Sequence, residues 1–198
     1  MSPSVLLFVL TAAGLAAGAP ETQKAVFAGG CFWGVDAVFR HVQGVVGVVS
    51  GYAGGDAGTA EYDLVSTGRT GHAEAVEVTY DPQQISYAKL LEIFFTVAHD
   101  PTQLNRQGPD VGTQYRSAVF YADGTQRQTA SDFIKRLTRA NAFAAPIVTA
   151  VVPLVAFYPA ESYHQDYLAH HLTQPYIVYN DLPKLDRLKE RFPALYRP

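Results

Sequence analysis

The chain has 198 residues, of which 48% are hydrophobic and 12% aromatic, enough to bury the core of one domain. Its formal net charge of -3 gives no reason to expect a nucleic-acid or anionic-membrane surface. Because Cys31 is the only cysteine, an internal disulfide and a cysteine-based structural zinc site are both excluded.

The N-terminal segment differs in composition from the rest of the chain. Residues 4–19 are apolar and rich in small side chains, and they end in Ala17-Gly18-Ala19. This pattern is typical of a signal peptide with its cleavage site, and the run is too short for a comfortable membrane-spanning helix. We therefore expect residues 1–19 to be removed and the mature protein to be exported to the periplasm, with no membrane segment. A retained N-terminal anchor or an uncleaved tail is the alternative.

The next part of the chain predicts strands alternating with helices. Strands are indicated by apolar and β-branched runs over residues 24–28, 45–52 and 74–80. A helix is expected from Cys31 onward, because apolar side chains then recur at helical spacing. Asp36 and Arg40 would form an i,i+4 pair on its outer face. Another helix would begin after an N-cap at Ser86 and stop before Pro101.

The remaining chain begins with the polar run 100–114, which is expected to be a long loop of the kind that usually carries function. Thr125 and Gln128 would form a capping box for a helix that follows the turn at Asp123. Pro153 would mark an edge or a bulge in an apolar segment. Strands are indicated at 117–121 and within 147–158, and helices near 161–170 and 183–192.

This order of elements, β-α-β-β-α-β-α-β, predicts an α+β fold. We expect a two-layer sandwich in which a mixed or antiparallel sheet carries helices on one face, related to the split βαβ, or ferredoxin-like, plan. Residues 20–198 would form a single domain, with a core over about 24–168 and a C-terminal extension over 169–198.

Cys31 is the candidate reactive group. It follows the Gly29-Gly30 turn at the expected start of a helix, where free backbone N–H groups and the helix dipole favour a thiolate. Phe32 and Trp33 come next, and this aromatic pair is suited to gripping a small apolar group. The alternative is a buried, inert cysteine that serves as a small hydrophobe.

Glu74 is the candidate acid. Strand alternation places it on the same face as Val76 and Val78, whereas Glu77 faces solvent. Apolar surroundings disfavour the charged carboxylate, so we expect the pKa of Glu74 to rise by about 3 units and the group to stay protonated at neutral pH. A protonated glutamate can act as a general acid. The alternative is a strand-end side chain that bends into water.

Other polar side chains are weaker candidates. Tyr62 and Tyr115 stand in polar, loop-like surroundings rather than on an apolar stripe, which favours a functional role. His99 and His164 are the histidines that could act as a base, although structural hydrogen bonding is the preferred interpretation of both. The histidine spacing does not match a zinc site, so no metal is expected.

Several separated motifs resemble one known family. They occupy residues 30–34, 51–55, 70–74, 99–103 and 107–117, in that order. These motifs are similar to those of the A-type peptide methionine sulfoxide reductases, which act on the S epimer, and the resemblance as a whole covers roughly residues 24–168. The resemblance implies an oxidoreductase that repairs oxidative damage by reducing methionine sulfoxide, in proteins or free, to methionine.

The resemblance also implies roles for individual residues. Cys31 would attack the sulfoxide sulfur and become a sulfenic acid. Glu74 would protonate or hydrogen-bond the sulfoxide oxygen, helped by the hydroxyls of Tyr62 and Tyr115. The substrate-binding residues would be Phe32 and Trp33 at the methyl group, and Asp110, which would orient the site or bind the substrate backbone.

The chain departs from the family pattern in its recycling residues. Many members carry resolving cysteines, commonly in a glycine-rich C-terminal tail, whereas residues 173–198 contain neither cysteine nor glycine. Ser66 stands where some relatives have another cysteine. We therefore expect no cofactor and an external thiol reductant: thioredoxin, glutaredoxin, glutathione or a similar donor. The other partners would be oxidised proteins or free methionine sulfoxide, and the protein would be a monomer.

Other functions also use an activated thiol. A thiol peroxidase reacts with peroxide, and a redox-sensing module reports oxidant through its sulfenic acid. Peroxidases need no inward-facing acid beside an aromatic cradle, and sensors usually keep a resolving thiol nearby, so the reductase is preferred. A cysteine hydrolase would need a base on Cys31, and the sequence places no histidine there.

Overall fold

The computed structural model describes residues 21–198, so the expected signal peptide lies outside the described residues. Six strands form one sheet in the order β7-β6-β1-β3-β2-β8. Their bounds are β1 Gln23–Gly29, β2 Val45–Ala53, β3 Ala73–Tyr80, β6 Ser117–Tyr121, β7 Ala150–Pro153 and β8 Phe157–Pro159. The β6–β7 pair is parallel and the other neighbours are antiparallel, so the sheet is mixed, as predicted.

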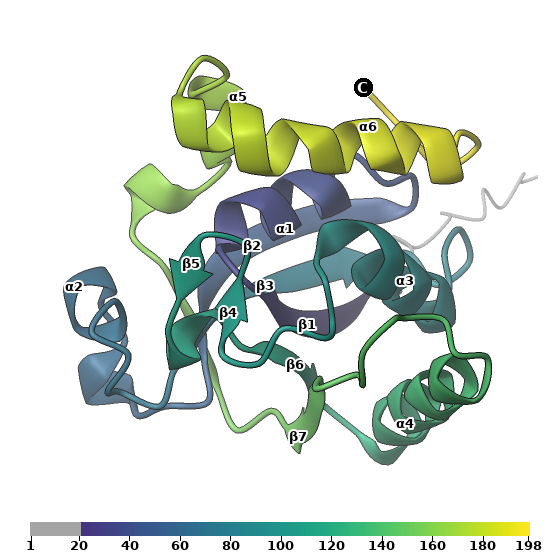
Figure 1. Ribbon diagram of the computed structural model, residues 1–198, viewed down its shortest axis with the longest axis horizontal. Coiled ribbons are helices and arrows are strands. Elements are labelled where there is room, and N and C mark those ends of the chain that lie inside the picture. The colour runs from purple at the N-terminus through teal and green to yellow at the C-terminus, as the bar shows by residue number, and fades with distance from the viewer. Residues whose placement is uncertain (1–20) are drawn as a thin grey trace, which may run out of the picture.

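Helices cover one face of this sheet (Figure 1). The helices are α1 Phe32–Arg40, α2 Tyr62–Val65, α3 Tyr87–Ile93, α4 Gly124–Arg139, α5 Tyr167–His170 and α6 Leu182–Arg191, of which the short α2 lies to one side of the sheet (Figure 1). Phe27 of β1 stacks between two of them, with ring centroids 5.3 Å from Phe39 of α1 and 4.9 Å from Phe94 just after α3. The C-terminal helix α6 lies beside α1 (Figure 1).

The core has the topology of a split βαβ unit, which confirms the predicted α+β sandwich. The elements β1-α1-β2-β3-α3-β6 follow one another along the chain, with the short helix α2 inserted before β3 and a small hairpin over residues 106–111 inserted before β6. The four strands lie in the order β6-β1-β3-β2. Strand β1 is therefore central, between β3 and β6. Its last residue, Gly29, leads directly into the turn before Cys31, so the middle of the sheet positions the candidate nucleophile.

Two segments form more structure, or different structure, than the sequence predicted. Segment 147–158 is not one strand: its two halves become β7 and β8 at opposite edges of the sheet, and β7 ends at Pro153. The loop 100–114 contains a small hairpin, β4 Arg106–Gln107 paired with β5 Asp110–Val111. Backbone pairing in this hairpin gives the polar segment a defined conformation, although its sequence has no hydrophobic pattern.

The helix caps match the prediction in one case and differ in another. Ser86 caps α3 as expected, and its hydroxyl accepts a backbone N–H from the first turn. Helix α4 is capped by Asp123, whose carboxylate accepts the N–H of Gln126 at 2.8 Å. The expected capping box of Thr125 and Gln128 is wrong, because the helix begins before Thr125 and a carboxylate takes the cap position.

The C-terminal part contains less helix than expected in one place. Segment 161–170 forms a 3-10 turn, Ser162–His164, and the short α5, because Asp166 between them has a φ of +51° and interrupts a continuous helix. The predicted helix near 183–192 is confirmed as α6. Within residues 21–198, no helix is both long and apolar enough to cross a membrane.

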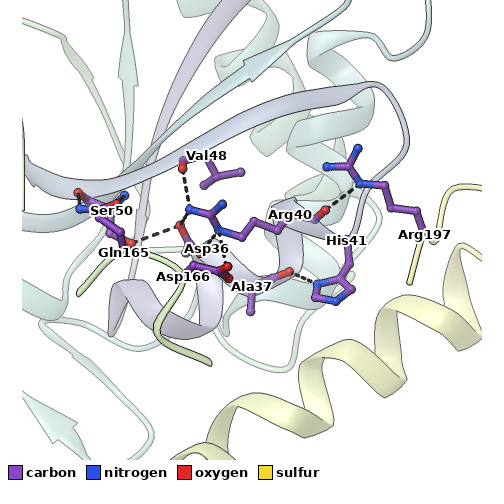
Figure 2. A network of polar contacts seen from close by, with 9 residues as sticks. All are labelled: Asp36, Ala37, Arg40, His41, Val48, Ser50, Gln165, Asp166 and Arg197. Atoms are coloured by element: carbon purple, nitrogen blue, oxygen red, sulfur yellow. Dashed lines mark hydrogen bonds and ion pairs between the residues drawn. The ribbon is translucent and has the colours of Figure 1, made fainter. Parts of the chain in front are cut away.

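The Asp36–Arg40 pair forms, but the prediction that it lies on an outer face is wrong. Nε of Arg40 is 2.6 Å from the Asp36 carboxylate, and Asp36 is only 2% exposed. Figure 2 shows β2 and the segment around Asp166 packed over this side of α1. Arg40 also donates to the carbonyl of Val48 at 2.8 Å and lies 3.5 Å from Asp166, so it joins three segments.

Candidate active site

A tight turn places Cys31 at the N-terminal end of α1. Gly30 has a φ of +90°, which disfavours a side chain, and a Cβ there would also collide with Gln107. Cys31 is the N-cap residue of α1 and is 8% exposed, and the backbone N–H of Trp33 lowers the pKa of its thiol. The structure therefore places the thiol at the helix start, as the sequence predicted.

Glu74 of β3 faces Cys31 from the sheet. The residue is 2% exposed, and its Oε2 accepts the backbone N–H of Phe32 at 3.0 Å. The Cys31 thiol lies close enough to lower the pKa of this carboxyl. Burial is the main reason that the pKa of Glu74 rises to about 8, and the nearby Asp110 acts in the same direction. Glu74 thus carries its proton at neutral pH and does not bend into water.

The Cys31 thiol, by contrast, is not a preformed thiolate. Burial raises its pKa well above the usual range, and Glu74 and Asp181 act in the same direction. The Trp33 N–H and the Lys184 ammonium lower the pKa without offsetting burial. The expectation that the helix start alone favours the thiolate is therefore wrong, because desolvation outweighs the helix dipole. Deprotonation has to accompany the reaction rather than precede it.

Tyr62 and Tyr115 bring phenol groups to the same region. Tyr62 is the first residue of α2, Tyr115 ends the 3-10 turn Thr113–Tyr115, and both side chains are half-buried. Burial, and next the charge of Glu74, raise the pKa of each phenol, and the charge of Cys31 adds to both shifts. Both hydroxyls therefore keep their protons and can donate hydrogen bonds.

Asp110 of β5 belongs to the same group of residues. It accepts a hydrogen bond from the hydroxyl of Tyr176, a residue that the sequence analysis did not single out. Partial burial raises the pKa of Asp110, whereas Tyr176 and the charge of Lys184 lower it. Its own charge raises the pKa of Glu74 and of Tyr115, which shows that the carboxyl lies within electrostatic reach of both.

Phe32 and Trp33 form an apolar wall beside the nucleophile. Phe32 is 1% exposed, with its ring centroid 6.0 Å from Tyr52 and 5.0 Å from His164. Trp33 stacks on Tyr167 at 3.8 Å with an interplanar angle of 7°. Its indole Nε1–H donates to Nδ1 of His164 at 3.2 Å, so both the edge and the face of the indole are held.

Segment 161–167 plays a part in this arrangement that the sequence did not predict. The carboxylate of Glu161 accepts the Tyr52 hydroxyl and the Tyr62 backbone N–H, each at 2.8 Å. His164 and Tyr167 of the same segment contact Trp33. The dense mixture of carboxylate, aromatic and amide side chains is unlike a surface helix, and that composition is the signal that could have identified the segment.

The C-terminal extension makes a second contribution that the sequence analysis missed. Asp181 is fully buried and pairs with Lys184 of α6 at 3.0 Å. Their side chains fill the space beside Gly34, where a Cβ would collide with both. The last glycine of the 30–34 motif is therefore required for close packing of the C-terminal region on α1. An ordinary amphipathic helix pattern carried no signal of this contact.

His99 is placed as a structural residue. Its Nδ1–H donates to the carbonyl of Phe94 at 2.9 Å, and its Nε2 pairs with the hydroxyl of Ser117 at 2.7 Å. Burial lowers the pKa of His99 to about 4, so the ring stays neutral. Both ring nitrogens are engaged in holding β6 against the end of α3, which leaves neither free to act as a base.

Comparisons with known proteins agree with this geometry. A family model described as peptide methionine sulfoxide reductase matches residues 23–195. The protein "Peptide methionine sulfoxide reductase MsrA 2" of Mesorhizobium japonicum is 58% identical over 178 residues, which cover 90% of this chain and 91% of that protein.

Solved structures show the same likeness. Reduced Mxr1 from Saccharomyces cerevisiae is 32% identical with a TM-score of 0.71, covering 77% of this chain and 87% of that chain. Mxr1 in complex with Trx2 is 23% identical with a TM-score of 0.50, covering 74% and 84%, and shows likeness of fold alone. Because the family match covers most of the sequence, this chain belongs to the peptide methionine sulfoxide reductase family.

Proposed function

We propose that this chain reduces the S epimer of methionine sulfoxide with Cys31 as nucleophile and Glu74 as general acid. Membership of the family supports the reaction class. The observation that carries the residue roles is the buried Glu74 carboxyl, which accepts the backbone N–H of Phe32, the residue after Cys31, and whose pKa is affected by the Cys31 thiol. A protonated acid beside a thiol is the pairing that sulfoxide reduction needs.

The chemistry follows from where the donors lie. A sulfoxide sulfur is a weak electrophile until its oxygen is protonated or strongly hydrogen-bonded, and Glu74, Tyr62 and Tyr115 can donate to that oxygen. As Glu74 gives its proton to the oxygen, the Cys31 sulfur attacks the sulfoxide sulfur, and the thiol proton replaces the one lost by Glu74. The attack forms a bond between the Cys31 sulfur and the substrate sulfur. This S–S bond and the S–O bond of the substrate then break as the hydroxyl group moves to the Cys31 sulfur, which releases methionine. Sulfoxide and thiol thus become sulfide and sulfenic acid, a balanced two-electron transfer between sulfurs.

The aromatic wall supplies the stereochemical preference. The substrate methyl group would pack on Phe32 and Trp33, while its oxygen faces Glu74. Once the methyl group lies on the aromatic wall and the oxygen faces Glu74, only one epimer can present its sulfur to Cys31 while the rest of the methionine side chain points out of the site. Asp110, half-buried in β5, would accept a hydrogen bond from the substrate backbone.

Regeneration requires two thiols from outside the chain. Cys31 is the only cysteine, so the sulfenic acid reacts with an external thiol to give a mixed disulfide and water. A second thiol then releases Cys31 and leaves the donor as a disulfide. Thioredoxin, glutaredoxin or glutathione can supply this chemistry, and the complex of the yeast relative with Trx2 supports thioredoxin as a candidate.

We also propose that the mature protein acts as a monomer in the periplasm. The support for export is the apolar, small-residue segment 4–19 that ends in Ala17-Gly18-Ala19. Cell fractionation followed by N-terminal sequencing of the mature protein tests this. A protein recovered with its first residues intact in the cytoplasm would contradict it.

Separated S and R epimers of a methionine sulfoxide peptide test the reaction itself. With dithiothreitol as reductant, the purified chain should convert the S epimer to methionine and leave the R epimer unchanged. Cys31→Ser is the matched control, which should be inactive on both. Equal reduction of both epimers, or activity that survives in Cys31→Ser, would contradict the proposed roles.

A further inference from the structure

The side-chain amide of Gln165 extends the sheet where a strand stops. Strand β8 ends at Pro159, which faces Gly51 on β2. At the next position along β2, the N–H of Ser50 donates to Oε1 of Gln165, and the Ser50 carbonyl accepts from Nε2, both at 2.9 Å. The same Nε2 reaches the carbonyl of Ala160 at 2.9 Å. Gln165 thus pairs with β2 as a strand residue would (Figure 2).

The following residue, Asp166, is held in an unfavourable conformation. Its φ of +51° lies in the left-handed region, which is unfavourable for residues other than glycine. Its carboxylate lies 3.5 Å from Nε of Arg40, and Arg40 is fixed by Asp36 and by the carbonyl of Val48 (Figure 2). This turn lets the residues on its two sides face different elements, β2 on one side and α1 on the other.

The neighbours of these anchors make the contacts with the indole of Trp33. His164 immediately precedes Gln165 and accepts the indole N–H at 3.2 Å. Tyr167 immediately follows Asp166 and stacks on the indole face at 3.8 Å. The edge and the face of the ring are therefore held by the residues that flank the anchored pair.

We propose that Gln165 is a positioning residue for substrate recognition, which fixes segment 161–167 on β2 and thereby sets the orientation of the Trp33 indole. The proposal rests on the role of Trp33 as part of the methyl-binding wall. The hydrogen bonds of Gln165 go to Ser50 and Ala160 rather than to the nucleophile or the acid. Its loss should therefore weaken substrate binding and leave the chemical step intact.

The chain offers unusually direct readouts for this test. Trp33 is the only tryptophan, so intrinsic emission reports on that indole alone, and Cys31 is the only cysteine, so alkylation reports on the nucleophile alone. The variant is Gln165→Leu, which keeps the side-chain size and removes its hydrogen bonds. The matched control is Gln83→Leu, the same substitution at an exposed position before α3.

For Gln165→Leu we expect KM for the S-sulfoxide peptide to rise about tenfold, the size of effect that a change of about 1.4 kcal/mol produces. The kcat should stay within about twofold, since the acid and the nucleophile keep their partners. Trp33 emission should shift to longer wavelength and become easier to quench with acrylamide. The pH profile of Cys31 alkylation should match the wild type, and Gln83→Leu should match it in every measurement.

Unchanged KM and unchanged Trp33 emission in folded Gln165→Leu would overturn the proposal. A loss of kcat together with an altered Cys31 alkylation profile would overturn it too, because the role would then be general support of the site. If Gln165→Leu does not fold, Gln165→Glu serves instead, since it keeps an acceptor for Ser50 and loses both donors; the same outcomes apply. Failure of the wild type on both epimers would contradict the proposed function instead, and the emission measurement would still decide whether Gln165 positions Trp33.

Discussion

Glu74 and Phe32 are joined across the site by a hydrogen bond: Oε2 of the glutamate accepts the Phe32 backbone N–H at 3.0 Å. This bond fastens the acid on β3 to the residue that immediately follows the nucleophile on α1. It also occupies one carboxyl oxygen with a donor, so a proton on the carboxyl resides on the other oxygen. Strand and helix thus fix the acid and the thiol relative to each other before substrate arrives.

The raised pKa of Glu74 predicts the pH dependence of catalysis. The acid form is the active form, and with a pKa of about 8 it predominates below that pH. We expect kcat for the wild type to be maintained on the acid side and to fall as pH rises through about 8.

Glu74→Gln should lower kcat by about ten- to ten-thousand-fold, with a smaller effect on KM, because an amide donates a hydrogen bond but delivers no proton. Steady-state rates from pH 6 to 10 check both. An unchanged kcat with a raised KM in Glu74→Gln would reduce Glu74 to a binding residue.

The Cys31 thiol should alkylate slowly at neutral pH in the free enzyme. Burial and the Glu74 carboxyl raise its pKa well above the usual range, so the iodoacetamide profile should have its midpoint above that of an ordinary exposed thiol. Glu74→Gln should move the midpoint downward, because the amide carries no negative charge to oppose the thiolate. A midpoint below neutrality in the wild type would show that the helix start prevails over desolvation after all.

Separate truncation of the two wall residues should affect substrate recognition. Phe32→Ala and Trp33→Ala should each raise KM for the methyl-bearing substrate and reduce the preference for it over analogues with a bulkier group on sulfur. The reason is that both aromatic surfaces would contact the methyl group, and burial of one methyl is worth about 0.8 kcal/mol. Competition between the two substrates measures this preference. Unaltered discrimination in both variants would place the methyl group elsewhere.

Gly34 should be intolerant of even a methyl group. Gly34→Ala would drive a Cβ into the Asp181–Lys184 pair, and such overpacking typically costs about 1–3 kcal/mol. The melting temperature of Gly34→Ala should therefore lie several degrees below that of the wild type. Gly58→Ala is the matched control, since among the described residues no atom lies within 4 Å of a Cβ built there. Equal melting temperatures for the two variants would show that the C-terminal region can shift to accommodate the added methyl group without loss of stability.

Local patterns predicted the elements well where periodicity and turn residues agree. The alternation in 74–80 placed Glu74 inward, and the glycine turn placed Cys31 at a helix start. The pattern failed where tertiary packing decides: Asp36 was predicted to be a surface partner of Arg40, but it is buried, accepts a hydrogen bond from Ser50 of β2 and lies near the segment around Asp166 (Figure 2).

The same limit explains the residues of the site that were missed. Glu161 and Asp181 contact the site through tertiary packing, and their sequence neighbours gave no pattern that pointed toward Cys31. The thiol pKa was misjudged for a related reason. The helix dipole can be inferred from local sequence, but the surroundings of the thiol include Glu74 of β3, Asp181, and Lys184 of α6, which only the folded structure brings together.

A single turnover without reductant tests the central claim most directly, namely that Cys31 alone takes the sulfoxide oxygen. Mixed with excess S-sulfoxide peptide and no thiol, the chain should release one methionine per protein, and dimedone should then label Cys31, because the chain holds no other cysteine to resolve the sulfenic acid. Added glutathione should convert the unlabelled sulfenic acid to a mixed disulfide and restart turnover. Release of more than one methionine per protein in the absence of thiol, or release of one with neither a dimedone adduct nor an intermolecular disulfide on non-reducing electrophoresis, would contradict the account.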